Sequence, residues 1–390
     1  MDFADKYEIA IIGGGMSGCI LASLLDNKNV CLLEMNSRLM DKIYATGNGR
    51  CNLTNININT GCYHTEDGSL LNNILKRYDN IDFINYLESI GLFTRDIEGY
   101  VYPINFEASS VVEAIENRVY KNVDVKLNFK VEKIKIGDIY KIYSGDKIIT
   151  CKKIILATGG IASKYYKSDI SPYKFLPIKI TPILPALCAL KVDKKYFKEL
   201  AGVRVNARSC LIIEDKVIDT EIGQIQFKKD FLSGIQIFQH SIEAIKALKA
   251  NKKVYITLDY IYDKNKEDIK EMLLKNGLDH LKFVLPKKLA KIAIYLASRK
   301  NQDEIMKINS VMNIITSHKI NIVGYDEYNN AQTTSGGYKL SELNQNLESN
   351  MHKNMYIVGE VLDVTGKCGG YNIQWCYTSA KAVSEKILNE

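Results

Sequence analysis

Several features that mark common protein classes are scarce or missing in this chain of 390 residues. Its nine cysteines form no C-x-x-C pair, which argues against a disulfide framework or a zinc site and favours a reducing compartment. Its five histidines are dispersed, so no metal cluster is visible. No apolar run approaches the roughly 18 residues that a membrane span needs, and the N-terminus has no signal-peptide pattern. We therefore expect a cytoplasmic protein without a metal site.

The charge balance excludes little. The formal net charge is +7, but the lysines are spread along the chain and no aromatic–basic cluster typical of RNA sites is visible. We interpret the charge as a composition bias that helps to attract an anionic cofactor or substrate. A content of 46% hydrophobic residues is typical of globular chains of this length, which form one large or two to three modest domains. We expect a small-molecule substrate and neither nucleic acid nor membrane as partner, and the oligomeric state stays open.

The most informative stretch lies near the N-terminus, where a short apolar strand at residues 9–12 runs into a glycine-rich turn. Gly13, Gly15 and Gly18 follow the spacing G-x-G-x-x-G. In that pattern the first glycine permits a tight turn, the second lets a pyrophosphate approach the backbone, and the third lets the next helix pack closely. The N-terminus of that helix would direct N–H groups and a positive dipole end at the phosphates.

The second strand, at residues 29–34, ends in an acid, Glu34. Glu34 lies about 20 residues beyond the first glycine, where a carboxylate would accept hydrogen bonds from a ribose. The strand before the turn, the helix after it and this acid together favour dinucleotide binding. The alternative is a glycine-rich loop that only turns the chain.

In the rest of the chain, the pattern of apolar residues changes once. Alternating apolar residues predict strands at 123–136, 139–143, 147–156, 186–192, 203–213, 216–222, 224–227 and 254–258. Helical periodicity predicts helices at 70–89, 109–119 and 235–250, and over much of 265–317 with an interruption at Pro286. From about Leu187 onward the pattern therefore indicates an antiparallel, β-rich domain that carries a small helical subdomain.

The C-terminal segment carries a further turn of the same kind. A buried strand at 355–363 ends in carboxylates, a flexible turn follows at 366–370, and a helix is predicted at 371–388. The start of that helix could meet a second electron-rich part of the same cofactor, such as the pyrimidine edge of a reduced flavin. Residues 41–55, small and polar with one arginine, form either a segment that wraps a ligand or a solvent loop.

These motifs together resemble a known family. Residues 11–18, 359–363 and 369–375 are similar to the glutathione-reductase-type FAD flavoproteins. Residues 46–55, Thr-Gly-Asn-Gly-Arg-Cys-Asn-Leu-Thr-Asn, resemble the signature of one bacterial family within them. That family is called NAD(P)/FAD-dependent oxidoreductases, aminoacetone-oxidase-like or bile-acid Δ4,6-reductase-like flavoproteins. The order of the motifs is specific for fold and cofactor and much less specific for substrate.

The resemblance implies an α/β fold in which a Rossmann-like FAD-binding domain is built from both chain ends. The implied boundaries are 1–185 with 332–390 for the FAD-binding domain, 186–258 with 318–331 for a β-rich substrate domain, and 259–317 for a helical insert. It also implies that residues 46–52 line the flavin, that Val131 offers backbone groups to the adenine, and that Asp363 reaches the ribityl or pyrophosphate region. The turn 370–373 would offer backbone N–H groups to the isoalloxazine.

The motifs and the resemblance together give one set of predicted cofactor-binding residues. The set comprises Gly13, Gly15, Met16, Ser17, Gly18, Glu34, Met35, Lys42, Thr46, Gly47, Asn48, Arg50, Cys51, Asn52, Val131, Thr158, Gly159, Gly359, Glu360, Asp363, Gly370, Tyr371, Asn372 and Ile373.

The chain also departs from the family at two loops. Residues 161–169 replace a Pro- and Gly-rich loop with a shorter segment rich in Ala, Ser, Lys and Tyr. At 227–235, Lys229 stands where relatives have a histidine and Ile235 where they have a proline. A catalytic role of that histidine therefore cannot be carried over to this chain.

The leading hypothesis is an FAD-dependent oxidoreductase that exchanges a hydride with a small organic substrate, with NAD(P)H or oxygen as redox partner. Only one dinucleotide fingerprint is evident, so a nicotinamide nucleotide would visit transiently. Tyr371, Lys229 and Cys368 are weak candidates for a proton donor, since they can equally cap a helix, remain a surface charge or fill a turn. Cys51 with Cys368 would permit thiol chemistry near the flavin. The alternatives are a flavin-dependent RNA-modifying enzyme and a non-catalytic flavin-binding protein.

Overall fold

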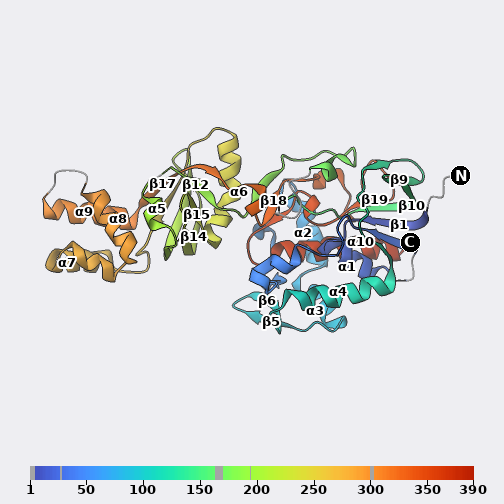
Figure 1. Ribbon diagram of the computed structural model, residues 1–390, viewed down its shortest axis with the longest axis horizontal. Coiled ribbons are helices and arrows are strands. Elements are labelled where there is room, and N and C mark those ends of the chain that lie inside the picture. Colours follow the sequence, from blue (N-terminus) through green and yellow to red (C-terminus); the bar gives the residue numbers. More distant parts are fainter. Residues whose placement is uncertain (1–4, 27–28, 163–169, 194, 299–302) are drawn as a thin grey trace. The chain divides into compact units, whose positions relative to one another are not determined.

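The chain folds into two compact units in a computed structural model that describes residues 5–26, 29–162, 170–193, 195–298 and 303–390 (Figure 1). Unit 1 contains residues Met1–Leu184 and Thr333–Glu390, and unit 2 contains Pro185–Gln332. Unit 1 is therefore assembled from both ends of the chain, whereas unit 2 is one continuous segment.

Unit 1 is built on a sheet with the strand order β7-β2-β1-β10-β9-β8, in which β19 also pairs with β10. The strands are β1 (Asp5–Ile12), β2 (Val30–Leu33), β7 (Asp124–Lys126), β8 (Lys133–Lys135), β9 (Tyr140–Ser144), β10 (Lys147–Leu156) and β19 (Met355–Ile357). Strands β7, β2, β1, β10 and β19 run parallel, and β8–β9–β10 run antiparallel. Residues 9–12 are fully buried, which confirms the predicted parallel strand with both faces covered.

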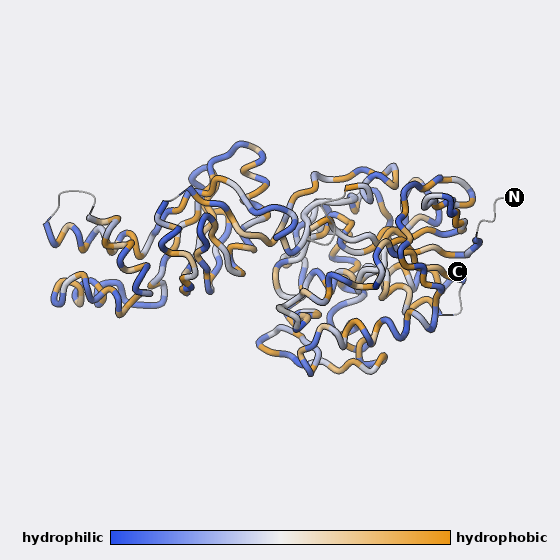
Figure 2. Tube along the Cα trace, in the orientation of Figure 1, coloured by the Kyte–Doolittle hydropathy of each residue, from blue (hydrophilic) through white to orange (hydrophobic). Residues whose placement is uncertain are grey.

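Three helices enclose the centre of unit 1. Helix α1 (Met16–Leu24) packs against α10 (Tyr371–Leu388) and α4 (Ala108–Asn122), and the first eight residues of α1 are buried. Figure 2 shows hydrophobic residues concentrated along β1 and β10. The N-terminal helix and the C-terminal helix therefore form one layer of the same core.

Two predicted elements of unit 1 are wrong in detail. The helix expected at 70–89 is two helices, α2 (Gly68–Arg77) and α3 (Asn80–Ser89), because the side chain of Asp79 caps α3 by accepting from Ile81 N and Asp82 N. The strand expected at 123–136 is divided into β7 and β8, which lie at opposite ends of the sheet. Asn128, with φ +54°, turns the chain between them.

Unit 2 is a closed antiparallel barrel with the order β12-β15-β14-β13-β16-β17. Its strands are β12 (Leu190–Val192), β13 (Arg204–Ile213), β14 (Lys216–Phe227), β15 (Phe231–Ser233), β16 (Val254–Asp259) and β17 (His318–Tyr325). Its helices are α5 (Phe197–Leu200), α6 (Ile235–Lys249), α7 (Lys266–Asn276), α8 (Lys287–Ala297) and α9 (Glu304–Thr316). The strands predicted at 216–222 and 224–227 are one continuous strand, and Pro286 precedes α8 as expected. Figure 2 shows that α7 is largely hydrophilic.

Short elements complete the fold. They are β3 (Thr54–Asn55), β4 (Tyr63–His64), β5 (Thr94–Ile97), β6 (Tyr100–Pro103), β11 (Leu184–Ala186), β18 (Thr333–Ser335) and β20 (Thr365–Gly366). Strand β20 pairs with β4, and β3 and β5 flank β6. The β20–β4 pairing brings the chain just before the C-terminal glycine turn close to residues 63–64.

A buried polar cluster joins α6 to the barrel. His240 Nδ1 lies 2.9 Å from Asp219 Oδ2, and His240 Nε2 lies 2.9 Å from Ser209 Oγ. Ser209 is fully buried, and its hydroxyl donates to Gln236 Oε1, whose amide donates to Gly223 O. The Ser209 hydroxyl is thus held by Gln236 as well as by His240, and the cluster ties α6 to strands β13 and β14.

Candidate functional site

The three glycines of the N-terminal turn have different surroundings. A Cβ on Gly13 would lie 2.4 Å from Ala157 O, and a Cβ on Gly18 would lie 1.9 Å from Gly13 O. These two positions are closed by neighbouring backbone, and Gly13 also has φ +109°. A Cβ on Gly15 would meet no described atom within 4 Å. The turn and the packing of α1 thus require two of the glycines, and the third faces open space.

Gly15 is the residue that precedes α1. Its φ of −77° is accessible to any residue, so neither the backbone conformation nor a neighbouring group explains a glycine there. An anionic group that approaches the N-terminus of α1 would occupy the space where a side chain would otherwise lie. The surroundings of Gly15 therefore fit the predicted role toward a pyrophosphate.

Glu34 follows the last residue of β2 and is only 4% exposed. Its Oε2 accepts from Gly14 N at 2.7 Å, and its Oε1 accepts from Asn36 N at 2.8 Å. Burial raises the pKa of Glu34, and these backbone donors partly offset the rise. Each oxygen retains a second lone pair, so the carboxylate is positioned to accept ribose hydroxyls.

A cleft beside this turn gathers predicted residues from four separate segments. Those that line it are Gly13, Gly15, Glu34, Met35, Val131, Thr158 and Gly159. Phe129 and Phe175, which sequence reasoning missed, also line it and provide flat apolar surfaces. The cleft has a volume of about 60 Å³, far below the several hundred Å³ of typical ligand pockets. Adenosine would therefore require side chains at the rim, such as the exposed Met35, to shift.

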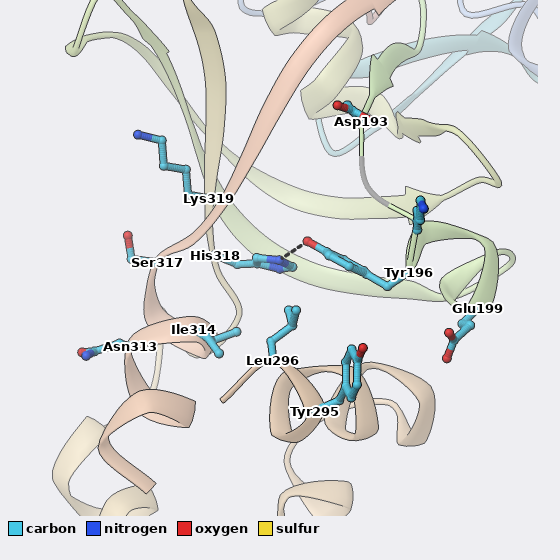
Figure 3. A pocket seen from close by; sticks show the side chains of 11 residues that line it. Asp193, Tyr196, Glu199, Tyr295, Leu296, Asn313, Ile314, Ser317, His318 and Lys319 are labelled. Atoms are coloured by element: carbon cyan, nitrogen blue, oxygen red, sulfur yellow. Dashed lines mark hydrogen bonds between the residues drawn. The ribbon is translucent and has the colours of Figure 1, made fainter. Parts of the chain in front are cut away.

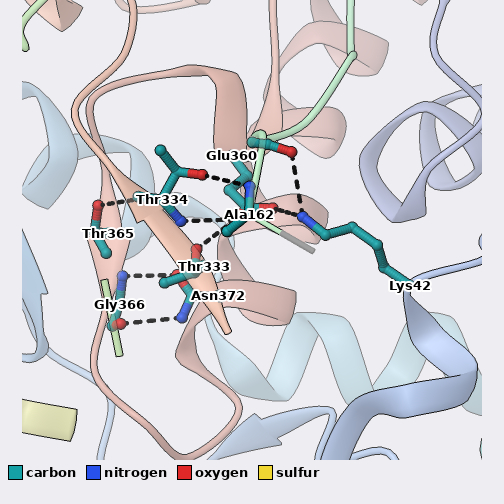
Figure 4. A network of polar contacts seen from close by, with 9 residues as sticks. Lys42, Ala162, Thr333, Thr334, Glu360, Thr365, Gly366 and Asn372 are labelled. Atoms are coloured by element: carbon teal, nitrogen blue, oxygen red, sulfur yellow. Dashed lines mark hydrogen bonds and ion pairs between the residues drawn. The ribbon is translucent and has the colours of Figure 1, made fainter. Parts of the chain in front are cut away.

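A second polar cluster surrounds Glu360 (Figure 4). Lys42 Nζ lies 3.1 Å from Glu360 Oε2 and also donates to Gly160 O at 3.3 Å. Glu360 Oε1 accepts from the Thr333 hydroxyl and from Thr334 N. Burial alone would raise the pKa of Glu360, but Lys42 and these donors outweigh it, so the pKa is lowered. Glu360 is therefore an acceptor-only carboxylate at neutral pH.

The structure brings together Lys42 and Glu360, which lie 318 positions apart in the sequence, and adds two threonines that sequence reasoning had not assigned. The only available signal was the run of small residues at 331–338. Thr334 also accepts from Ala162 N at 3.0 Å, so the same cluster fixes the turn that follows β10.

The C-terminal glycine turn approaches the chain at residues 54–63. Gly370, with φ +92°, lies so close to Thr54 that a Cβ would be 2.6 Å from its carbonyl oxygen. The Asn372 amide clamps Gly366, accepting from its N–H at 2.8 Å and donating to its carbonyl at 3.0 Å. The hydroxyl of Tyr63 donates to Tyr371 O at 3.0 Å. The backbone before α10 is thus held rigidly, as a site for a flat ligand edge requires.

Residues 43–49 form the 3-10 helix η1 (Ile43–Gly49), which is followed by Arg50, Cys51 and Asn52. Arg50 is exposed, whereas Cys51 is fully buried and burial raises the pKa of its thiol to about 12. The Asn52 amide, oriented with its NH2 group toward acceptors, donates to Val101 O and Thr54 O. Cys51 therefore remains a neutral thiol at neutral pH, which weakens the thiol-redox alternative.

The remaining predicted residues have varied surroundings. Gly359 uses both backbone groups internally, since its N–H donates to Ser379 Oγ and its carbonyl accepts from Trp375 Nε1. Burial raises the pKa of Tyr371, so this candidate proton donor holds its proton firmly. Lys229 is exposed in unit 2 and Cys368 is half-buried before α10. The Asn48 side chain and most of the loop predicted at 161–169 lie outside the described residues.

Comparison with known proteins decides the family. The family described as HI0933-like protein Rossmann domain matches residues 7–386. The chain belongs to the HI0933-like family. The HI0933-like chain is 31% identical over 407 residues to a 3-dehydro-bile acid delta(4,6)-reductase of Clostridium scindens, covering 97% of this chain and 99% of the relative. The HI0933-like chain is 24% identical to a ribosomal RNA dihydrouridine synthase of Escherichia coli, with 98% of each chain covered.

The fold also matches a solved structure. The HI0933-like chain has a TM-score of 0.53 and 8% identity to a 3-ketosteroid delta1-dehydrogenase from Sterolibacterium denitrificans, covering 99% of this chain and 100% of that one. That likeness supports the fold alone. Family membership and the full-length reductase relative confirm that the HI0933-like chain is an FAD-dependent oxidoreductase with a Rossmann-like domain.

None of the helices among the described residues is long and apolar enough to cross a membrane. Within the same residues, no group of three or more His, Cys, Asp or Glu side chains could hold a metal ion.

Proposed function

We propose that this protein binds FAD in unit 1 and exchanges a hydride between the flavin and a small unsaturated ketone or its saturated counterpart. NAD(P)H would supply the electrons when the ketone is reduced, and oxygen would accept them when the reaction runs as an oxidation. The observation that carries the proposal is the contrast within the turn, where Gly13 and Gly18 are closed by backbone and Gly15 alone faces open space. Support for the substrate class comes from the name of the bile-acid reductase relative.

The chain's own groups divide the work of holding the cofactor. Gly15 leaves room for the pyrophosphate at the start of α1, and Glu34 accepts the ribose hydroxyls. Glu360, kept ionised by Lys42, would accept hydroxyl groups of the ribityl chain. The rigid turn at Gly370 would present backbone N–H groups to the ring. Bound FAD would supply the hydride chemistry, and unit 1 would position it.

The first test is the visible spectrum of the purified protein, followed by anaerobic addition of NADH and of NADPH. We expect a yellow protein that one nucleotide bleaches, which would identify the electron source. A yellow protein that only oxygen reoxidises after reduction by a ketosteroid-type alcohol or saturated ketone would instead identify oxygen as its partner. A colourless protein that does not take up added FAD would contradict the proposal.

Gly15→Ala sharpens that test. The new methyl group is compatible with the backbone and with its neighbours, so the fold should be retained while FAD affinity falls at least about 100-fold, as expected when a group blocks ligand approach. The matched control is Gly68→Ala, which adds the same methyl group in open space at the first residue of α2. Equal flavin content in both variants would refute the role of Gly15.

A second candidate, a flavin-dependent RNA-modifying enzyme, is favoured by one surface of unit 2. Phe283, at the end of the 3-10 helix η4 (Leu278–Phe283), is 74% exposed, and Lys282 Nζ lies 5.3 Å from its ring centre. Lys287 and Lys288 begin α8, where the helix dipole disfavours cations. An exposed aromatic ring beside lysines that do not serve the helix matches a platform for single-stranded RNA. The dihydrouridine synthase relative supports this reading.

Binding of RNA distinguishes the two candidate functions. If the second is correct, ribosomal RNA fragments should bind the protein with salt-dependent affinity, and Phe283→Ala should weaken binding about 10-fold through lost stacking. The control is Tyr120→Phe, a change on an exposed residue of α4 in unit 1. Binding that is insensitive to Phe283→Ala would remove the observation that favours this candidate.

A further inference from the structure

A tyrosine hydroxyl can serve the fold or a ligand, and its hydrogen bonds distinguish the two cases. Unit 2 contains a cavity of about 730 Å³, and Figure 3 shows the Tyr196 hydroxyl at its wall directed at His318. Tyr196 Oη lies 2.8 Å from His318 Nε2, so this hydroxyl is engaged within unit 2. In unit 1, by contrast, the Tyr100 hydroxyl forms no hydrogen bond with any residue that the structure describes.

Tyr100 begins β6, the central strand of the small sheet β3-β6-β5, and lies opposite Asn55 and Ile97. The next residue, Val101, is only 1% exposed, so its face of the sheet packs into unit 1. Because successive side chains of a strand point to opposite faces, Tyr100 projects from the other face, where it is half-buried. Its neighbour Ile97 is 41% exposed. Tyr100 thus lies on a partly apolar surface that solvent can reach.

The Tyr100 ring also borders the C-terminal glycine turn. A Cβ on Gly369, whose φ is +126°, would lie 3.0 Å from Tyr100 Cε1 and 3.2 Å from Tyr371 Cε2. Two aromatic rings therefore converge on Gly369, and a side chain there would displace them. The Asn55 amide, opposite Tyr100 in the sheet, donates to Gly369 O at 3.4 Å. The small sheet and the turn are thereby held together with the Tyr100 ring between them.

The two tyrosines at this turn use their hydroxyl groups differently. The Tyr371 hydroxyl forms a hydrogen bond with Cys62, and burial together with this bond raises the pKa of Tyr371. Tyr371, which the sequence offered as a proton donor, is therefore held by the protein itself. Of this pair, Tyr100 has the hydroxyl that no other described residue binds.

Reduction of an unsaturated ketone needs a donor of this kind. When a hydride adds to the carbon β to the carbonyl, the electron pair of the C=C bond shifts and negative charge develops on the ketone oxygen. A hydroxyl that donates to this oxygen stabilises the enolate that results. The enolate then takes a proton from water at the carbon α to the carbonyl, which gives the saturated ketone. One hydride and one proton are added, and the donor hydroxyl keeps its own proton.

We propose that Tyr100 contacts the substrate and donates a hydrogen bond to the ketone oxygen, while the surface beside Ile97 carries the apolar skeleton. This inference rests on the proposed function, in which bound FAD supplies the hydride and the turn at Gly369 and Gly370 holds its ring. Tyr100 is then a catalytic residue, and Asn55 is a positioning residue that fixes the turn beside it.

The test compares the full-length wild-type protein with Tyr100→Phe, both loaded with FAD. The flavin is reduced with dithionite without oxygen, cyclohexenone or testosterone is added, and reoxidation is followed by visible absorbance. We expect Tyr100→Phe to bind FAD as the wild type does and to be reoxidised about 100-fold more slowly, because a donor to the developing oxyanion is lost. Binding of the same enone to the oxidised protein, measured by calorimetry, should weaken only about 5-fold, as for one ordinary hydrogen bond.

The matched control is Tyr102→Phe, the same change two residues further along the same face of β6, which should be reoxidised at the wild-type rate. Equal rates for the wild type and Tyr100→Phe, or equal losses in both variants, would overturn the role of Tyr100. Loss of flavin from Tyr100→Phe would show that this residue serves the cofactor and would also overturn it. A wild-type protein that binds FAD but is reoxidised by neither enone would refute the ketone substrate of the proposed function, and this inference with it.

Discussion

Unit 1 is distinguished by features of its backbone, whereas unit 2 is distinguished by contacts between side chains. In unit 1 the decisive features belong to the backbone, namely a turn closed at Gly13 and Gly18 and open at Gly15. In unit 2 the features are side chains, such as Tyr196 and His318, brought together by the barrel and its helices. A backbone requirement leaves a fixed residue type at a fixed spacing, whereas a side-chain cluster can be assembled from any sufficiently close positions. Substitutions in the two units should therefore lower the stability of the protein in different ways.

The largest effect should come from Gly18→Ala. Its Cβ would lie 1.9 Å from Gly13 O, a backbone atom that cannot move without opening the turn, so we expect a loss of roughly 3 kcal/mol in the stability of unit 1. Trp375 is the only tryptophan of the chain and is buried in α10, so its fluorescence in denaturant reports on unit 1. Gly15→Ala is the control and should unfold like the wild type. If the unfolding curves of Gly18→Ala and Gly15→Ala coincide, the predicted difference between closed and open glycines is wrong.

The second-largest loss of stability should be confined to unit 2. Ser209→Ala removes the hydroxyl between His240 and Gln236, leaving buried polar groups without a partner, which costs about 2 kcal/mol. Far-UV circular dichroism in denaturant should show the loss, while the Trp375 transition stays in place. Ser298→Ala, on an exposed residue after α8, is the matched control. A shift of the Trp375 transition with Ser209→Ala would show that the two units do not unfold separately.

A smaller, pH-dependent effect is expected for Lys42→Met. The pKa of Glu360 is lowered in the folded protein, so its contribution to stability is present above the ordinary carboxyl pKa and lost as pH falls through the folded value. Without Lys42 burial dominates and that pKa rises. At pH 7 the variant should be less stable by about 1 kcal/mol, and the difference should shrink below about pH 4. Denaturation followed by Trp375 fluorescence at several pH values measures this.

The matched control is Lys381→Met, which breaks a pair with Glu385 on the surface of α10. It should change stability by only a few tenths of a kcal/mol. If the difference between Lys42→Met and the wild type is the same at pH 7 and pH 4, the ion pair is not its cause.

The smallest effect on stability should come from Phe283→Ala. Because Phe283 is 74% exposed, we expect both transitions to stay within about 0.5 kcal/mol of the wild type. A larger loss would mean that Phe283 packs against the protein and is no free platform for a partner. The measurement therefore shows, before any RNA is added, whether the Phe283 ring stabilises the fold or is free to contact a partner.

The sequence predicted the local backbone features well, and it predicted the contacts between distant residues poorly. The strand, the three glycines and Glu34 lie within about 20 residues and depend on local geometry, so their arrangement was predictable. The division of residues 123–136 between opposite ends of the sheet was not, because pairing partners distant in the sequence decide it. Lys42 and Glu360 were each predicted, but not their contact with each other or with Thr333.

In unit 2 the sequence predicted alternating strands but not their closure into a barrel, since the closing pair β12–β17 joins residues far apart in the chain. It likewise carried no signal for the Tyr196–His318 contact, which spans 122 positions. Neither residue belongs to a motif, and each side chain is unremarkable until the fold brings the two together.

The two-segment construction of unit 1 has a consequence for biosynthesis. Strand β10 needs β19 as its parallel neighbour, and α1 needs α10 as its packing partner, yet β19 and α10 are translated after the whole of unit 2. Unit 2 is one uninterrupted stretch and can fold while the ribosome is still adding the closing segment. During that interval the first half of unit 1 exposes an unpaired strand edge and an uncovered apolar helix. The nascent chain should therefore depend most on chaperones before β19 and α10 emerge, and chain termination before these elements should yield aggregates that contain a folded barrel.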